Sequence, residues 1–98
     1  MKHQAFENVW DALADSPEEV VNLTLRSELM TAIEKAVDRW DVAQGEAAMR
    51  LGISRPRLND LLRGKMSKFS LDALTNLATR AGLKVKLSVG KNMRKDAA

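Results

Sequence analysis

Three glycines, Gly52, Gly64 and Gly82, divide the second half of the chain into short segments, and this spacing restricts the fold more than any other feature of the sequence. Glycine readily takes the left-handed conformation with which many helices end. Ser54 and Ser70 stand between these glycines, and a serine in such a place commonly caps the start of a helix. The pattern predicts three short helices, over residues 44–50, 54–63 and 70–81.

A longer helix is predicted before them. Ser16 is suited to cap it, Pro17 to occupy its first position, and Glu19 completes a Ser-x-x-Glu capping box. The helix extends to about residue 40, with an apolar stripe that is expected to face the core: Leu25, Leu29, Ile33, Val37 and Trp40. A fifth, short helix is predicted near the N-terminus from another apolar stripe: Phe6, Val9, Trp10 and Leu13.

The C-terminal part has a different period. Apolar residues alternate with polar ones and predict a half-buried β-strand over residues 83–89: Leu83, Val85, Leu87 and Val89. A single strand leaves its backbone groups unpaired, so these four residues are expected to dimerise with the same strand of a second protomer, or to pair with an extended N-terminal segment. The expected fold is one all-α domain, 1–98, with five helices and this strand. Its predicted parts are an N-terminal segment, a helical core, the strand and a basic tail, at residues 1–15, 16–82, 83–89 and 90–98.

The composition argues against several classes of function. The chain has no cysteine and one histidine, His3, so neither thiol chemistry nor a histidine metal cluster is expected. No apolar run approaches the roughly 20 residues of a membrane span, and the N-terminus lacks the apolar part of a signal peptide. Glu18 and Glu19 have no catalytic partner in the sequence pattern, and no glycine-rich phosphate loop is present. We expect a cytoplasmic protein that is not an enzyme and uses no cofactor.

Charge is distributed unevenly along the chain. Residues 1–49 carry four basic and ten acidic side chains, a net charge of −6. Residues 50–68 carry six basic side chains and one acidic, a net charge of +5, and residues 69–98 add six basic and two acidic, a net charge of +4. Six cationic groups within nineteen residues suit a phosphate-binding surface, although a solvated surface alone would also explain them.

The two helices predicted over residues 44–63 have the pattern of a helix-turn-helix. Ala47 and Ala48 provide the small side chains that let a second helix cross closely, and Gly52 suits the turn. Ile53 would fill the space under the turn, Ser54 would cap the second helix, and Leu58 and Leu61 would fix it to the core. Four polar residues would then face outward: Arg55, Arg57, Asn59 and Asp60. This combination predicts a DNA-reading helix in preference to a purely structural helical hairpin.

Residues 42–83 resemble the Xre/Cro-CI family of phage-repressor-like helix-turn-helix domains, and most closely its HigA-like antitoxins. The resemblance rests on residues 6–13, 51–57, 61–65 and 69–74. The chain departs from the family pattern at Ala43, where a Thr or Ser cap is usual, and at Gly45 inside the first motif helix. Asp41 is expected to cap that helix in place of residue 43.

The resemblance and the chemistry of the side chains imply specific roles. The expected base-contacting residues are Arg55, Pro56, Asn59 and Asp60. Arginine can bridge O6 and N7 of guanine, and asparagine suits adenine. The expected phosphate contacts are Gln44, Ser54, Arg57, Arg63 and Lys65. Because phosphates repel an acid, Asp60 has an alternative role, which is to orient Arg57 or Arg63.

The sequence therefore predicts a transcriptional regulator that binds a palindromic double-stranded operator as a homodimer. Its resemblance implies an autorepressor that is also the antitoxin to a RelE/HigB-like ribonuclease toxin. The acidic segment 6–19 would contact that basic toxin, or would instead complete the helical fold. Two alternatives stay open: a standalone repressor without a toxin, and a protein-interaction module that no longer binds DNA.

Overall fold

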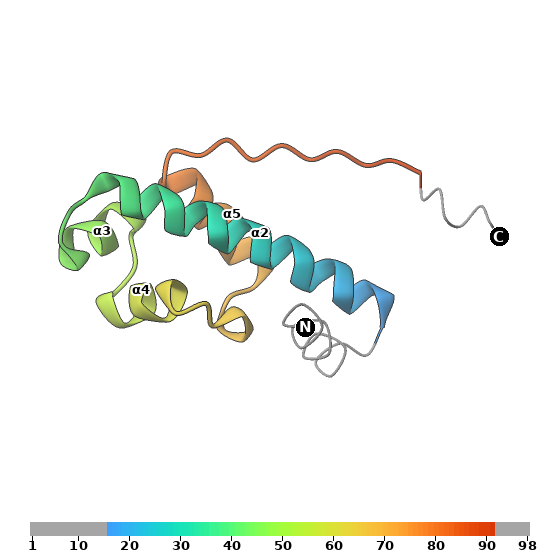
Figure 1. The fold of residues 1–98 in the computed structure, drawn as a ribbon, viewed down its shortest axis with the longest axis horizontal. Helices are drawn as coiled ribbons and strands as arrows, with labels where there is room; N and C mark the ends of the chain where they lie inside the picture. Colours follow the sequence, from blue (N-terminus) through green and yellow to red (C-terminus); the bar gives the residue numbers. More distant parts are fainter. Residues whose placement is uncertain (1–15, 92–98) are drawn as a thin grey trace, which may run out of the picture.

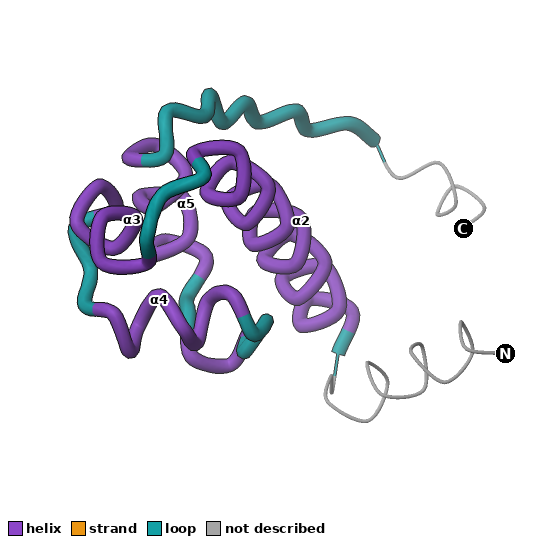
Figure 2. Tube along the Cα trace, turned by 60° about the vertical axis from the view of Figure 1, so that its left-hand side comes forward, coloured by secondary structure: helices purple, strands orange, loops and turns teal. Residues whose placement is uncertain are grey.

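The computed structural model describes residues 16–91. They form four α-helices, α2 (Pro17–Trp40), α3 (Gln44–Leu51), α4 (Arg55–Leu62) and α5 (Leu71–Arg80), with one short 3₁₀ turn, η1 (Met66–Lys68). The long helix α2 packs alongside α5, and α3 and α4 lie across one end of this pair (Figures 1 and 2). None of the described helices combines the length and apolar character needed to cross a membrane.

The predicted helix starts are confirmed by their caps. The hydroxyl of Ser16 accepts a hydrogen bond from the Glu19 N–H at 3.2 Å, and Pro17 is the first residue of α2. Ser54 and Ser70 accept equivalent bonds at the starts of α4 and α5. Each serine satisfies one of the backbone donors that a helix start leaves without a partner.

The buried stripe of α2 differs from the predicted one. Ile33 is fully buried, but Leu25 is 40% exposed. Residues four apart advance 400° around a helix with 100° per residue, so a strict four-residue repeat turns away from the core by about 40° at each step. The buried residues of the helix are instead spaced by seven, three and three positions: Leu23, Met30, Ile33 and Ala36.

One apolar core joins all four helices. Its fully buried side chains are Ile33, Leu51, Leu58, Leu61, Phe69 and Leu74. Ala47 and Ala48, both buried, are the small residues at which α3 packs against its neighbours, as predicted. The core thus holds α3 and α4 against the α2–α5 pair and leaves the outer side of α4 open to solvent.

The predicted five-helix fold with a C-terminal strand is wrong. Residues 16–91 contain four α-helices and no strand, and the short helix predicted over Phe6–Leu13 lies outside the described residues. Alternating side chains produce a strand only where another strand pairs with the backbone, and every other long element in the described part of the chain is a helix. After the Leu83 N–H, which donates to the Ala78 carbonyl, no backbone hydrogen bond involves residues 84–91 within the described chain.

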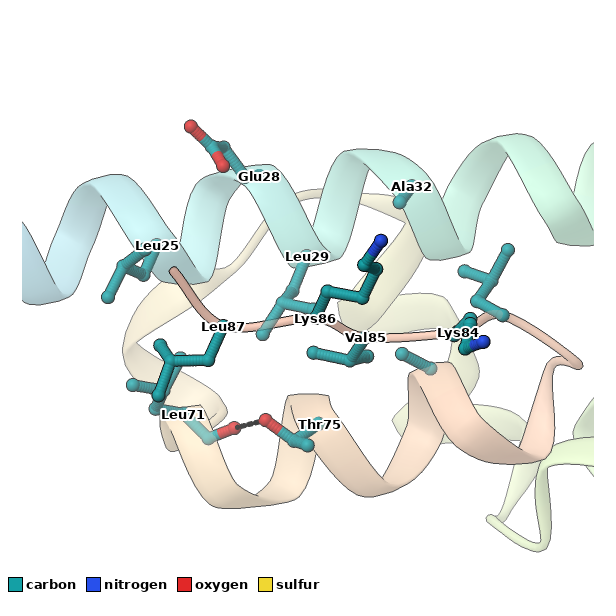
Figure 3. A pocket seen from close by; sticks show the side chains of 12 residues that line it. Leu25, Glu28, Leu29, Ala32, Leu71, Thr75, Lys84, Val85, Lys86 and Leu87 are labelled. Carbon is teal, nitrogen blue, oxygen red and sulfur yellow. Dashed lines mark hydrogen bonds between the residues drawn. The ribbon is translucent and has the colours of Figure 1, made fainter. Parts of the chain in front are cut away.

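Residues 83–87 instead run along a groove between α2 and α5 (Figure 3). This groove has a volume of about 400 Å³ and is lined mainly by apolar side chains, among them Leu25, Leu29 and Leu71. Leu83 is half-buried in it, whereas Leu87 and Val89 are 86% and 84% exposed. The alternation predicted from the sequence therefore does not produce one buried face in this segment.

Candidate nucleic-acid interface

The outer face of α4 carries the polar side chains that the sequence pattern singled out. Leu58 and Leu61 are fully buried beneath the helix, and Arg55, Pro56 and Asn59 are exposed on its other side. Among the described residues, the side chains of Arg55 and Asn59 make no hydrogen bond or ion pair with the protein. Their donors and acceptors are therefore available to a ligand.

The turn between α3 and α4 fixes the angle at which this face is presented. Gly52 has φ 71°, which an L side chain rarely adopts, and the Ile53 N–H bonds to the Ala48 carbonyl at 3.0 Å to close the end of α3. The guanidinium of Arg80, from the end of α5, lies against Gly52, and a Cβ at that position would come within 2.6 Å of its Nη1. No pattern in the sequence indicates this contact.

Gln44 begins α3 and is exposed beside the start of α4. Ala43, directly before it, occupies the N-cap position of α3 and makes no side-chain bond there. In the first turn of the same helix, the ideal Cβ position at Gly45 lies 4.0 Å from the Arg55 Cδ. The side chain of Arg55 thus passes the first turn of α3, so that the expected base-contacting and phosphate-contacting residues are brought close together.

Asp60 is paired with a residue that neither sequence alternative named. Its carboxylate lies 3.5 Å from the Lys65 ammonium, across the turn that follows α4. Arg63, one of its two predicted partners, is exposed and makes no ion pair within residues 16–91. The acidic charge on this helix is therefore partly balanced by the lysine expected to contact phosphate.

Arg57 does not share the exposed face of α4. Its Nη1 donates to the Lys68 carbonyl at 2.9 Å, and its guanidinium carbon lies 4.1 Å from the centre of the Phe69 ring. The stacked geometry is that of a cation–π contact. Arg57 is thus turned toward the segment after α4, and its contact with phosphate stays a prediction.

Cationic side chains dominate this end of the molecule. Four of them are exposed on α4 or directly after it: Arg55, Arg63, Lys65 and Lys68. In residues 16–91, no group of three His, Asp or Glu side chains is placed to hold a metal ion. The surface chemistry is that of a binding face for an anionic polymer.

Comparisons with known proteins agree with this geometry. Residues 12–90 match a family described as a helix-turn-helix domain. A solved structure named "Putative XRE Family Transcriptional Regulator" is 30% identical in sequence, with a TM-score of 0.70 over 79% of this chain and 86% of that one. The chain belongs to the XRE family of helix-turn-helix proteins. None of the curated proteins matches it.

Membership of the XRE family makes the protein a DNA-binding transcriptional regulator, with double-stranded DNA as its ligand. The helix-turn-helix of this family corresponds to α3 and α4 in this chain. The exposed cationic side chains lie on its second helix, α4, and directly after it. The resemblance to the XRE family that the sequence predicted is confirmed, whereas the resemblance to its HigA-like members stays a prediction.

Proposed function

We propose that this XRE-family protein is a sequence-specific repressor that reads an operator with the exposed face of α4. The observation that carries the proposal is the position of Arg55, at the start of that helix, and of Asn59, one turn further along. Both are exposed, and their side chains have no partner within the described residues. Pro56 lies between them on the same face and suits contact with a thymine methyl group. Asp60 is the fourth proposed base-contacting residue, once DNA draws Lys65 away from it.

The proposed phosphate contacts surround this face. They are Gln44, Ser54, Arg63 and Lys65, which lie at the start of α3, at the cap of α4 and directly after α4. Gln44 would also present the positive end of a helix to a phosphate. Arg57, the remaining predicted phosphate contact, donates a hydrogen bond to the Lys68 carbonyl.

The test is a binding measurement on the DNA upstream of the protein's own reading frame, with random DNA as competitor. Arg55→Ala is expected to weaken operator binding by about 1–3 kcal/mol and to leave binding to random DNA nearly unchanged. The matched control is Lys91→Ala, a charge loss in the C-terminal segment, on the other side of α2 from α4 (Figure 1). Equal losses on operator and random DNA for Arg55→Ala would contradict base reading.

We further propose that the protein represses its own gene and serves as the antitoxin of a RelE/HigB-like ribonuclease. Support comes from the net charge of −6 in residues 1–49, since a protein that binds RNA presents a basic surface. In this proposal residues 16–82 form the DNA-binding core, and the acidic segment 6–19 contacts the toxin. Deletion of residues 1–14 is then expected to abolish toxin neutralisation while operator affinity and the thermal midpoint stay unchanged. If toxin neutralisation, operator affinity and the thermal midpoint all fell together, the deleted segment would instead be part of the folded core.

A further inference from the structure

The segment that follows α4, Gly64 to Phe69, contains only the three-residue turn η1 as regular structure. It nevertheless carries two exposed cations, Lys65 and Lys68, next to the proposed DNA-reading face. Three of its backbone carbonyls, those of Met66, Lys68 and Phe69, accept hydrogen bonds from arginine side chains. This segment is called the post-α4 loop below.

The first arginine is Arg26, from the N-terminal half of α2. Its Nη1 donates to the Met66 carbonyl at 3.0 Å and to the Phe69 carbonyl at 3.3 Å. Its Nε donates to Asn22 Oδ1 at 2.7 Å, and its Nη2 lies 3.7 Å from a Glu19 carboxylate oxygen. The side chain is only 12% exposed. Arg26 is therefore held in place by its own helix while it holds the loop from the side of the core.

The second arginine is Arg57, from α4. It reaches the Lys68 carbonyl and covers the ring of Phe69, a side chain that is 1% exposed. A guanidinium can stack its planar face on an aromatic ring while its edge donates hydrogen bonds. Arg26 and Arg57 thus hold the same few residues of the loop from two different helices.

We propose that Arg26 and Arg57 are positioning residues for DNA binding, which fix the post-α4 loop so that Lys65 and Lys68 are already placed for the phosphate backbone. The inference rests on the proposed DNA-binding function of the α4 face. A loop without these bonds would have to be ordered before Lys65 or Lys68 could hold a phosphate, and the cost in backbone freedom would offset the gain from those contacts. The contacts would then be largely lost, and affinity would fall for every DNA sequence. Neither arginine needs to touch DNA for this effect.

The experiment measures affinity for operator and random DNA over a range of salt concentrations, well below the thermal midpoint of each variant. Arg26→Met is expected to weaken binding to both DNAs by about tenfold, which is the order of the cost of fixing the backbone of one residue. The salt slope should fall by about one to two, because up to two phosphate contacts are lost. Lys91→Met, which removes one charge elsewhere, is the control and should leave both quantities unchanged.

Double variants separate positioning from direct contact. If both arginines act through the loop, Arg26→Met combined with Arg57→Met should weaken binding by less than the product of the single effects. Lys68→Met should likewise add little in the Arg26→Met background, although it weakens binding on its own. If Arg57→Met lowers the salt slope and Arg26→Met does not, Arg57 contacts phosphate directly and the proposal is overturned.

Arg26→Lys covers the case in which Arg26→Met does not fold. Lysine keeps the charge but cannot reproduce the planar set of donors, so an intermediate loss of affinity is expected. A lower thermal midpoint with unchanged affinity and salt slope would show a purely structural role and overturn the proposal. Failure of the proposed function is a different result, because wild-type protein would then show no preference for the upstream DNA over random DNA.

Discussion

Ala43 shows how a single residue can depart from a family pattern without breaking a helix. It takes the N-cap position of α3 but has no hydroxyl to bond the free N–H groups of the first turn. The predicted substitute, Asp41, does not cap α3. It ends α2 in a left-handed conformation, with φ 51°, and its N–H donates to the Asp38 carbonyl. Among the four α-helices of residues 16–91, α3 is therefore the one whose start has no side-chain cap.

We predict that Ala43→Ser stabilises the protein. Serine at an N-cap typically contributes about 1 kcal/mol relative to alanine, because its oxygen accepts a bond from the first turn. Ala43 is exposed and already extended, with φ −65° and ψ 154°, so the new side chain fits without rearrangement. Urea unfolding should show a higher midpoint at unchanged slope. An unchanged midpoint would mean that the hydroxyl does not reach the helix.

Glu34, on α2, links stability to pH. Burial raises the pKa of its carboxyl above the ordinary value of 4.5, because desolvation penalises the charged form. Between the unfolded and folded pKa values the folded state binds more protons, so the contribution of Glu34 to stability is full below the unfolded value and is lost as the pH rises through the folded one.

Glu34→Gln is therefore expected to raise the thermal midpoint at neutral pH, since glutamine carries no charge to desolvate. The gain should disappear when the pH falls below 4.5, where the wild-type carboxyl is protonated in both states. Thermal unfolding of both proteins across this range checks the prediction. Glu18→Gln, at the exposed start of the same helix, is the control. A gain that did not depend on pH would exclude desolvation as its cause.

At the scale of elements, the joint between α3 and α4 depends on a glycine. Gly52→Ala places a side chain in the left-handed region, which costs about 1–2 kcal/mol. The added Cβ would also meet the Arg80 guanidinium, although this exposed and flexible group can move aside. We expect a lower free energy of unfolding, measured in urea, with most of the loss remaining in an Arg80→Ala background. Complete recovery in that background would show that the contact, and not the backbone, sets the cost.

The whole molecule raises the question of how two recognition helices reach one operator. We propose a homodimer whose contact uses the apolar side chains of residues 83–89, above all Leu87 and Val89, which are 86% and 84% exposed. Two helix-turn-helix units bind successive major grooves when their recognition helices are about 34 Å apart. Exposed apolar side chains that lie close together can mark a protein interface, and Val85 in the same segment is also exposed.

Replacement of both Leu87 and Val89 by Asp should give monomers in sedimentation experiments and weaken operator binding, because each protomer then binds one half-site alone. The two substitutions should change the stability of the isolated protomer little, because both side chains are almost fully exposed within a single chain. Lys84→Asp together with Lys86→Asp is a control for the added acidic charge. A wild-type protein that sediments as a monomer at micromolar concentrations would contradict the proposal.

Local chemistry determined much of this fold, and the sequence alone was enough to predict those parts. A serine hydroxyl caps the residues that directly follow it, and a glycine ends the helix that precedes it, so Ser16, Ser54, Ser70 and Gly52 define helix boundaries without reference to the rest of the chain. The helix-turn-helix and its exposed Arg55 were predictable for the same reason, because they depend on the spacing of neighbouring residues.

Only the tertiary structure decided which residues distant in sequence meet. Arg26 lies 40 residues from its partner Met66, and a sequence pattern does not encode which carbonyl an arginine reaches. One signal was available: Arg26 falls at the three- and four-residue spacing of the buried Leu23, Met30 and Ile33, where a cation needs buried partners. The extended segment after Gly82 shows the opposite case. Its alternation is a local property, but a strand forms only when a second strand pairs with it, and the described chain provides none.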